Sequence, residues 1–282
     1  MANLDAPYSL RLANGHRWCF IGGQKSRSWL DNLASIMQLK LGDICGSVRI
    51  VIKSNKECEP GDRSLPKLIN ASFYPGDDVS DTEYYIVQDE NHDRNRLQMW
   101  NLVHYICRQE QTSGGFPFHA GLIELRGKGA LLAAPSGVGK STCCLRIPPP
   151  WRALADDQTL VVCEDRERYY VHPLPTWSAL TGGGHEPTWN VERFVSLSAI
   201  FFLQQAEQDE VQSLDRWQVS ALVYKSARAA SIIGDLILSK EERRLEKKRQ
   251  FHNACDLARV VPGYSLKVSR QGEFWREIEK VF

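Results

Sequence analysis

Residues 131–145, with the sequence LLAAPSGVGKSTCCL, constrain the fold more than any other part of this chain. An apolar run typical of a strand ends at a turn that contains Gly137 and Gly139, and a helical pattern follows at once. Small residues let successive backbone N–H groups point at phosphate oxygens, and the start of a helix adds a positive dipole end. This order predicts a nucleotide-binding turn in a protein of mixed α/β class.

The predicted nucleotide-binding residues form one continuous segment: Pro135, Ser136, Gly137, Val138, Gly139, Lys140, Ser141 and Thr142. Lys140 has the length and charge to reach the β- and γ-phosphates, and the Ser141 hydroxyl suits Mg2+. The segment departs from the usual P-loop pattern at Ala134, where a glycine is expected, because alanine adopts positive φ only at a cost. We therefore predict ATP and Mg2+ as ligands, with a purely structural turn as the alternative.

Two neighbouring carboxylates follow the turn. Prolines 148–150 end the helix, and Asp156 and Asp157 come after the apolar pair Leu154-Ala155. Taken alone, such a pair usually marks the end of a strand. Close behind a phosphate-binding turn, it predicts a group that holds Mg2+ and accepts a proton from a substrate.

Composition sets outer limits on function. The chain has 282 residues, which is enough for two domains. Its formal net charge is only +1, so it does not produce the broad positive field of a dedicated nucleic-acid binder. The apolar runs are too short to span a membrane and the first residues lack a signal-peptide core, so we expect a cytoplasmic protein. The eight cysteines show no CxxC spacing, which favours buried, reduced thiols.

The pattern of the chain changes near residue 112, and we predict an N-terminal α/β domain over 1–112 and a nucleotide-binding domain over 113–282. In the first domain we predict strands at 47–53 and 83–88, helices at 28–39 and 97–110, and a loop at 56–66. In the second, a hairpin of 121–125 and 130–134 precedes the turn. Further strands are expected at 159–163, 169–172 and 197–203, and helices at 213–226 and 239–259.

These motifs together resemble the HPr kinase/phosphorylase family and its relatives, some of which accompany peptide-modifying pathways. The resemblance covers about 118–203: His119-Ala120 before the turn, the segment 135–141, and Ala155-Asp156-Asp157. It extends to Val261–Leu266 and Phe274-Trp275 near the end of the chain. It implies a phosphoenolpyruvate-carboxykinase-like P-loop core in a mixed sheet, and a homo-oligomer.

The resemblance also implies roles for individual residues. Asp157 is expected to act as general base, Asp156 to pair with His119 near the metal, and Lys140 and Ser141 to hold phosphate and Mg2+. The segment 175–184 lacks the Arg-Gly-rich signature of true HPr kinases, so HPr itself is not the expected substrate. The alternative for His119 is a structural histidine at the start of a strand, but its place ahead of the turn favours the functional role.

Two further residues are candidates for contact with substrate or the transferred phosphoryl group. His185 follows three glycines, although a surface loop explains it equally well. Arg193 is a candidate stabiliser of phosphoryl charge, although a solvated arginine at a strand edge is the simpler reading.

These expectations combine into one predicted activity. The chain is expected to transfer the γ-phosphoryl group of ATP to a Ser or Thr hydroxyl on a peptide or protein, which the N-terminal domain helps to select. Two alternatives remain: a kinase of a small hydroxylated metabolite such as an amino acid, and a non-catalytic nucleotide-binding partner in a biosynthetic complex. Neither a nucleic acid nor a membrane is an expected partner.

Overall fold

The computed structural model divides the chain into two compact units. The N-terminal unit contains Met1–Tyr105 and Pro175–Glu192, and the C-terminal unit contains Ile106–Leu174 and Arg193–Phe282. The structure describes residues 6–42, 48–54, 71–75, 81–87, 92–177, 189–232 and 234–282. The predicted loop at 56–66 and the candidate residue His185 lie outside these ranges. The predicted class, a mixed α/β protein, is confirmed, because both units contain a mixed sheet with helices.

The N-terminal unit is built on a six-stranded sheet with the order β3-β1-β2-β4-β6-β5. Its strands are β1 (Tyr8–Arg11), β2 (Arg17–Gly22), β3 (Lys40–Leu41), β4 (Val48–Ser54), β5 (Ala71–Pro75) and β6 (Asp81–Ile86). β2, β4 and β6 are parallel neighbours, whereas β1, β3 and β5 pair antiparallel. The strands predicted near residues 50 and 85 correspond to β4 and β6.

Two helices accompany this sheet, α1 (Arg27–Met37) and α2 (His92–Glu110). The apolar residues of α1 recur at helical spacing, and Trp29, Leu33 and Met37 are buried. Tyr84 of β6 lies within this core, where its ring is 6.1 Å from that of Trp29. Because a buried hydroxyl needs a partner, its donation to the Gln98 carbonyl at 2.6 Å secures α2 to the sheet.

The C-terminal unit contains a nine-stranded sheet. Seven of its strands follow the order β10-β8-β9-β13-β12-β11-β7, and the other two branch from β13, with β15 beside β13 and β14 beside β15. Its strands are β7 (Phe116–Phe118), β8 (Ala120–Leu125), β9 (Lys128–Ala133), β10 (Arg152–Ala155), β11 (Thr159–Cys163), β12 (Tyr169–Pro173), β13 (Val195–Gln205), β14 (Glu210–Ser213) and β15 (Gly263–Val268). The predicted hairpin is confirmed as β8–β9. Arg126 and Gly127 at its tip both have positive φ, as a two-residue hairpin turn requires.

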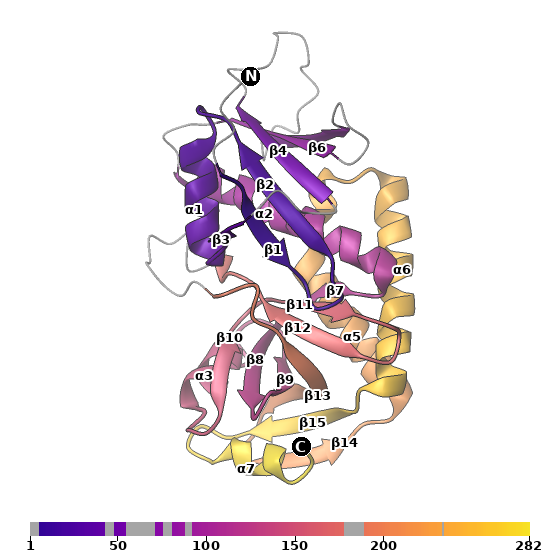
Figure 1. Cartoon of the computed structure of the whole chain (residues 1–282). Coiled ribbons are helices and arrows are strands. Elements are labelled where there is room, and N and C mark those ends of the chain that lie inside the picture. The colour runs from indigo at the N-terminus through magenta and orange to yellow at the C-terminus, as the bar shows by residue number, and fades with distance from the viewer. Residues whose placement is uncertain are drawn as a thin grey trace. The chain divides into compact units, whose positions relative to one another are not determined.

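Helices cover both faces of this sheet (Figure 1). They are α3 (Lys140–Arg146), α5 (Arg216–Ser231), α6 (Lys240–Val260) and α7 (Phe274–Glu279), with the 3-10 turns η2 (Gln111–Ser113) and η3 (Gly234–Ile237). α5 and α6 pack on the face that carries Leu122 and Leu131, whereas α3 and α7 pack on the face that carries Ile123 and Leu132. Consecutive residues of each strand therefore point into two different apolar layers, one on each face of the sheet.

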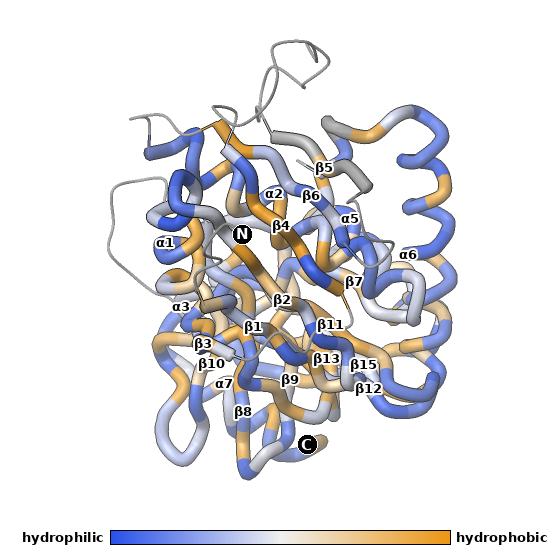
Figure 2. The backbone as a smooth tube through the Cα atoms, turned by 45° about the horizontal axis from the view of Figure 1, so that its top comes forward, coloured by the Kyte–Doolittle hydropathy of each residue, from blue (hydrophilic) through white to orange (hydrophobic). Residues whose placement is uncertain are grey.

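α6 is mostly hydrophilic along its length, as Figure 2 shows. Ser239 begins it with a capping box, in which its hydroxyl accepts from the Glu242 amide and the Glu242 carboxylate accepts from the Ser239 amide. Ala254 and Leu257 near its end join the apolar core. α6 therefore faces solvent over only part of its surface.

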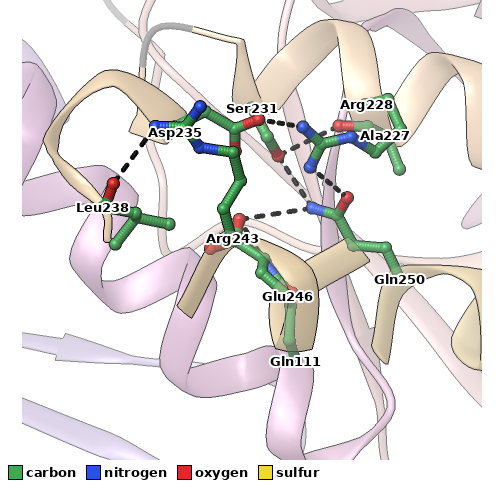
Figure 3. A network of polar contacts seen from close by, with 9 residues as sticks. All are labelled: Gln111, Ala227, Arg228, Ser231, Asp235, Leu238, Arg243, Glu246 and Gln250. Atoms are coloured by element: carbon green, nitrogen blue, oxygen red, sulfur yellow. Dashed lines mark hydrogen bonds and ion pairs between the residues drawn. The ribbon is translucent and has the colours of Figure 1, made fainter. Parts of the chain in front are cut away.

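A polar network joins α5, η3 and α6 (Figure 3). The fully buried Gln250 donates to Ser231 Oγ at 2.8 Å and accepts from Arg228 at 2.8 Å, and Arg228 also pairs with Asp235. Glu246 belongs to the same network, and burial raises the pKa of its carboxyl group. Buried polar groups that bond to one another in this way favour one arrangement of the two helices.

The described cysteines are free thiols: Cys19, Cys107, Cys143, Cys144, Cys163 and Cys255. Among the helices in the described ranges, none combines the length and apolar character needed to cross a membrane.

Candidate functional site

The turn that contains Gly137 and Gly139 connects β9 to α3. Gly137 and Gly139 have φ values of 81° and 115°, a region that L-residues adopt at a cost, so glycine is required at both positions. A Cβ built on either glycine would meet nothing within 4 Å, so open space borders the turn on that side. Ser136, Ser141 and Thr142 are exposed. The predicted segment is therefore accessible to a ligand.

Lys140 is the first residue of α3 and is only 6% exposed. Its ammonium donates to the Ala134 carbonyl at 3.0 Å and lies 3.5 Å from the Pro135 carbonyl. Burial lowers the pKa of Lys140, whereas the negative charges of Asp157 and Asp156 oppose that shift. The Lys140 side chain thus points back into its own turn and interacts electrostatically with both predicted carboxylates.

His119 and Asp157 form a pair, with Nε2 of the histidine 3.0 Å from Oδ1 of the aspartate. The hydrogen bond from His119 is the main reason that the pKa of Asp157 falls below its ordinary value. An ionised carboxylate can only accept, so Nε2 carries the proton and donates it to this bond. The observed partner of His119 is therefore Asp157, the residue after the Asp156 that the resemblance implied.

The sheet topology explains why these segments meet. β8 runs antiparallel to both β9 and β10, with Ala120 opposite Ala133 and Leu122 opposite Ala155. The start of β8 therefore lies beside the ends of β9 and β10. His119 precedes β8, the glycine turn follows β9, and Asp157 follows β10, so all three reach the same end of the sheet.

Close packing behind the turn fixes α3 against β8 and β10. Cys144 lies one helical turn after Lys140, and its thiol is 3.5 Å from the Ala155 carbonyl. Gly121 of β8 faces this thiol so closely that an added Cβ would lie 2.5 Å from the sulfur. Burial raises the pKa of Cys144, which keeps this thiol protonated. The sulfur therefore acts as a packing group between three elements.

Arg193 does not join this site. It pairs with Glu124 at 3.4 Å, beside Arg152, which contacts the same carboxylate at 2.8 Å. Glu124 is near the far end of β8, about 16 Å from His119 at the usual rise of a strand. Arg193 lies at the opposite end of the sheet from the turn, because it precedes β13 whereas the turn follows the end of its parallel neighbour β9, and its role in phosphoryl transfer stays a prediction. His185 lies outside the described residues.

Three residues with no sequence signal support the site. Ser226 of α5 donates to the His119 carbonyl at 2.9 Å. Arg146 at the end of α3 donates to the Ser269 carbonyl at 2.8 Å and stacks on the Phe274 ring. Gln205 at the end of β13 contacts the glycine turn. Each acts across a large sequence separation, which a local motif does not reveal.

In the described ranges, no group of three His, Cys, Asp or Glu side chains is arranged to hold a metal ion. Mg2+ commonly takes one or two protein carboxylates together with substrate phosphates, so Ser141 and Asp156 remain the predicted metal ligands.

The fold and this site define a mixed α+β protein in which a lysine-bearing strand–turn–helix segment lies close to a His–Asp pair. The family described as SynChlorMet cassette protein ScmC matches residues 85–282, and the chain belongs to that family. No match to the chain was found among curated proteins.

The predicted membership of the HPr kinase/phosphorylase family is wrong, because ScmC is the family that matches and no kinase family does. The error has a physical basis. Binding of a phosphate needs only a glycine turn, a lysine and a hydroxyl, and unrelated proteins carry such short motifs. The carboxykinase-like core that the resemblance implied loses its support with it.

Proposed function

We propose that this protein binds ATP with Mg2+ at residues 135–142 and transfers the γ-phosphoryl group to a Ser or Thr hydroxyl of a peptide or protein. The observation that carries the proposal is the common position of Lys140 and the His119–Asp157 pair at one end of the sheet. A cation held inside a glycine turn, beside an ionised carboxylate, provides what phosphoryl transfer needs from a protein: charge stabilisation and positioning.

Each residue has a defined part in this proposal. Backbone amides of the turn and the Lys140 ammonium would hold the phosphates, and Ser141 with Asp156 would hold Mg2+. Bound Mg2+ would supply positive charge that offsets the charge developing on the phosphoryl oxygens. The open space beside Gly137 and Gly139 is compatible with a bulky anion against the backbone.

Asp157 would accept the proton of the substrate hydroxyl. Its pKa is lowered, so it is ionised at neutral pH, and His119 holds one of its two oxygens. A carboxylate of this kind is a weak base. That weakness is tolerable, because in a loose transition state the hydroxyl loses its proton late and needs orientation more than strong basicity.

The direct test is transfer of label from γ-labelled ATP, using the purified full chain and Ser- or Thr-containing peptides as acceptors. Asp157→Asn keeps the shape of the side chain but removes the base, and should lower the rate about 100-fold or more. Lys140→Met should weaken binding of Mg-ATP in calorimetry. Asp256→Asn is a control for the loss of a carboxylate, because Asp256 lies on α6, is only half-buried, and pairs with the exposed Arg259.

The same assay separates the alternatives. Transfer to free serine but not to peptides would replace the peptide substrate with a small metabolite. Binding of Mg-ATP without transfer to any acceptor would favour a non-catalytic nucleotide-binding partner. If Mg-ATP produces no heat of binding, or if Asp157→Asn matches wild type in transfer, the proposal is wrong.

A further inference from the structure

Gln205 contacts the glycine turn from outside the segment that defines it. Its side-chain amide donates to the Val138 carbonyl at 3.2 Å and lies 3.4 Å from the Gly137 carbonyl. These are two consecutive carbonyls of the turn, and one side-chain nitrogen reaches both. The contact spans more than sixty residues of sequence.

The backbone of Gln205 is itself well held. It is the last residue of β13 and lies in parallel register with Val268 of β15. The next amide, of Ala206, donates to the Val268 carbonyl at 3.0 Å. The side chain therefore extends to the turn from a fixed point at the end of the sheet.

The contact controls the direction of the peptide groups. In a trans peptide the C=O and the following N–H point in opposite directions. When Gln205 holds the carbonyls of Gly137 and Val138, the N–H groups of Val138 and Gly139 must face away from Gln205. The first of these also donates within the turn, to the Pro135 carbonyl at 3.4 Å.

Without this contact, the two peptide groups have considerable freedom. They lie between Gly137 and Gly139, and glycine tolerates both signs of φ. Rotation of either peptide plane would exchange an N–H donor for a carbonyl oxygen. A carbonyl oxygen repels a phosphate, so the orientation of these planes decides whether the turn attracts or rejects an anion.

We propose that Gln205 is a positioning residue for phosphate binding: it holds two carbonyls outward so that the Gly139 amide, and not a carbonyl oxygen, faces the phosphates of a nucleotide. This inference rests on the proposed function, because it assigns Gln205 a role in that same site. The residue need not touch the nucleotide itself.

The test compares four variants with the wild-type full chain. Gln205→Glu keeps the shape but has no donor, and Gln205→Ala removes the donor without adding charge. Gln205→Lys restores a donor of similar reach. Gln204→Glu is the matched control, since it adds the same charge at the neighbouring exposed position, whose side chain points to the other face of the strand.

Affinities for Mg-ATP and for pyrophosphate are measured by calorimetry, and melting temperatures are recorded alongside. We expect Gln205→Glu and Gln205→Ala to weaken both ligands about 10-fold, while Gln205→Lys and Gln204→Glu stay within about 3-fold of wild type. In the transfer assay the KM for ATP should rise more than kcat falls. The melting temperatures should be unchanged, which a merely structural role would not predict.

The outcomes are separable. If wild type binds both ligands and the Gln205→Glu and Gln205→Ala variants bind as tightly as Gln204→Glu, the role of Gln205 is overturned and the proposed function stands. If wild type binds neither ligand, both inferences are wrong. If affinity falls only in proportion to a loss of folded protein, Gln205 supports the fold and does not position the turn.

Discussion

Replacing Gly121 by alanine should push α3 away from the sheet. The new Cβ would lie 2.5 Å from the Cys144 sulfur, well inside the separation of about 3.5–4.0 Å at which nonbonded atoms attract best. The Ala155 and Asp156 carbonyls, at 3.4 and 3.5 Å, leave no room on the side of β10. The thiol and its helix must therefore move by about 1 Å. We expect a loss of about 1–3 kcal/mol in the free energy of unfolding, as for other overpacked cores.

A second substitution shows whether the thiol is the cause. Cys144→Ala alone removes a buried group and should cost about 1 kcal/mol. In the Gly121→Ala background the same change removes the clash, so the double variant should be more stable than Gly121→Ala by about 1–2 kcal/mol. Urea unfolding followed by circular dichroism measures the free energy of unfolding of the wild type, the two single variants and the double variant. Gly23→Ala is the control, because an added Cβ there meets nothing within 4 Å.

The reasoning also predicts an effect on the site, since Lys140 lies one turn before Cys144 on α3. Binding of Mg-ATP should weaken in Gly121→Ala and recover in the double variant. If Gly121→Ala is as stable as Gly23→Ala, or if Cys144→Ala gives no recovery, then packing at this junction does not constrain α3.

Three further predictions concern charge and capping. His119→Ala should lower the free energy of unfolding by about 1 kcal/mol near neutral pH. Because the hydrogen bond from His119 lowers the pKa of Asp157, this stabilisation is present above the ordinary pKa of 3.8 and is lost as the pH falls through the pKa of Asp157 in the folded protein. The melting curves of variant and wild type should therefore converge in acid. Burial raises the pKa of Glu246, so the stabilisation by its protonated carboxyl group is present below the ordinary pKa of 4.5 and is lost as the pH rises through the pKa in the folded protein. Glu246→Gln should therefore gain stability relative to wild type as the pH increases. A constant difference between their melting temperatures would contradict this. Asp215→Ala removes the side chain that caps the start of α5 and should cost about 1 kcal/mol in urea unfolding, whereas Asp256→Asn on α6 should change little.

Local patterns predicted the long helices and several strands, although β1, β2, β10 and β15 were not among the predicted strands. The hairpin β8–β9 was predictable because its two apolar runs and its turn residues are adjacent in sequence. The charged pattern of α6 likewise predicted a helix. The same pattern did not reveal that Glu246 and Gln250 are buried, because their surroundings come from α5 and η3. Burial of polar side chains depends on tertiary neighbours that composition alone does not identify.

The candidate site was predictable only in part. The turn and Lys140 follow from one short segment, and His119 and Asp157 were among the predicted residues. The choice between Asp156 and Asp157 was not predictable, since both lie in the bend after β10, and the direction of that bend depends on a register shift between Ala153 and Ala155 in the pairing of β10 with β8. Gln205 was missed for a similar reason, because its reach depends on the parallel register of β13.

The parallel neighbours of β13 have a consequence for how the molecule is assembled. β9 flanks one edge of this strand, but the other edge is closed by β15, which the chain reaches only after α5 and α6. Parallel partners separated by so long a crossover find each other late. A chain cut after Val261 would still contain His119, Lys140 and Asp157, yet residues 200–205 of β13, which include Gln205, would have no partner on the edge that β15 occupies. During synthesis the turn would therefore acquire its outer support only once residues 263–268 have been made.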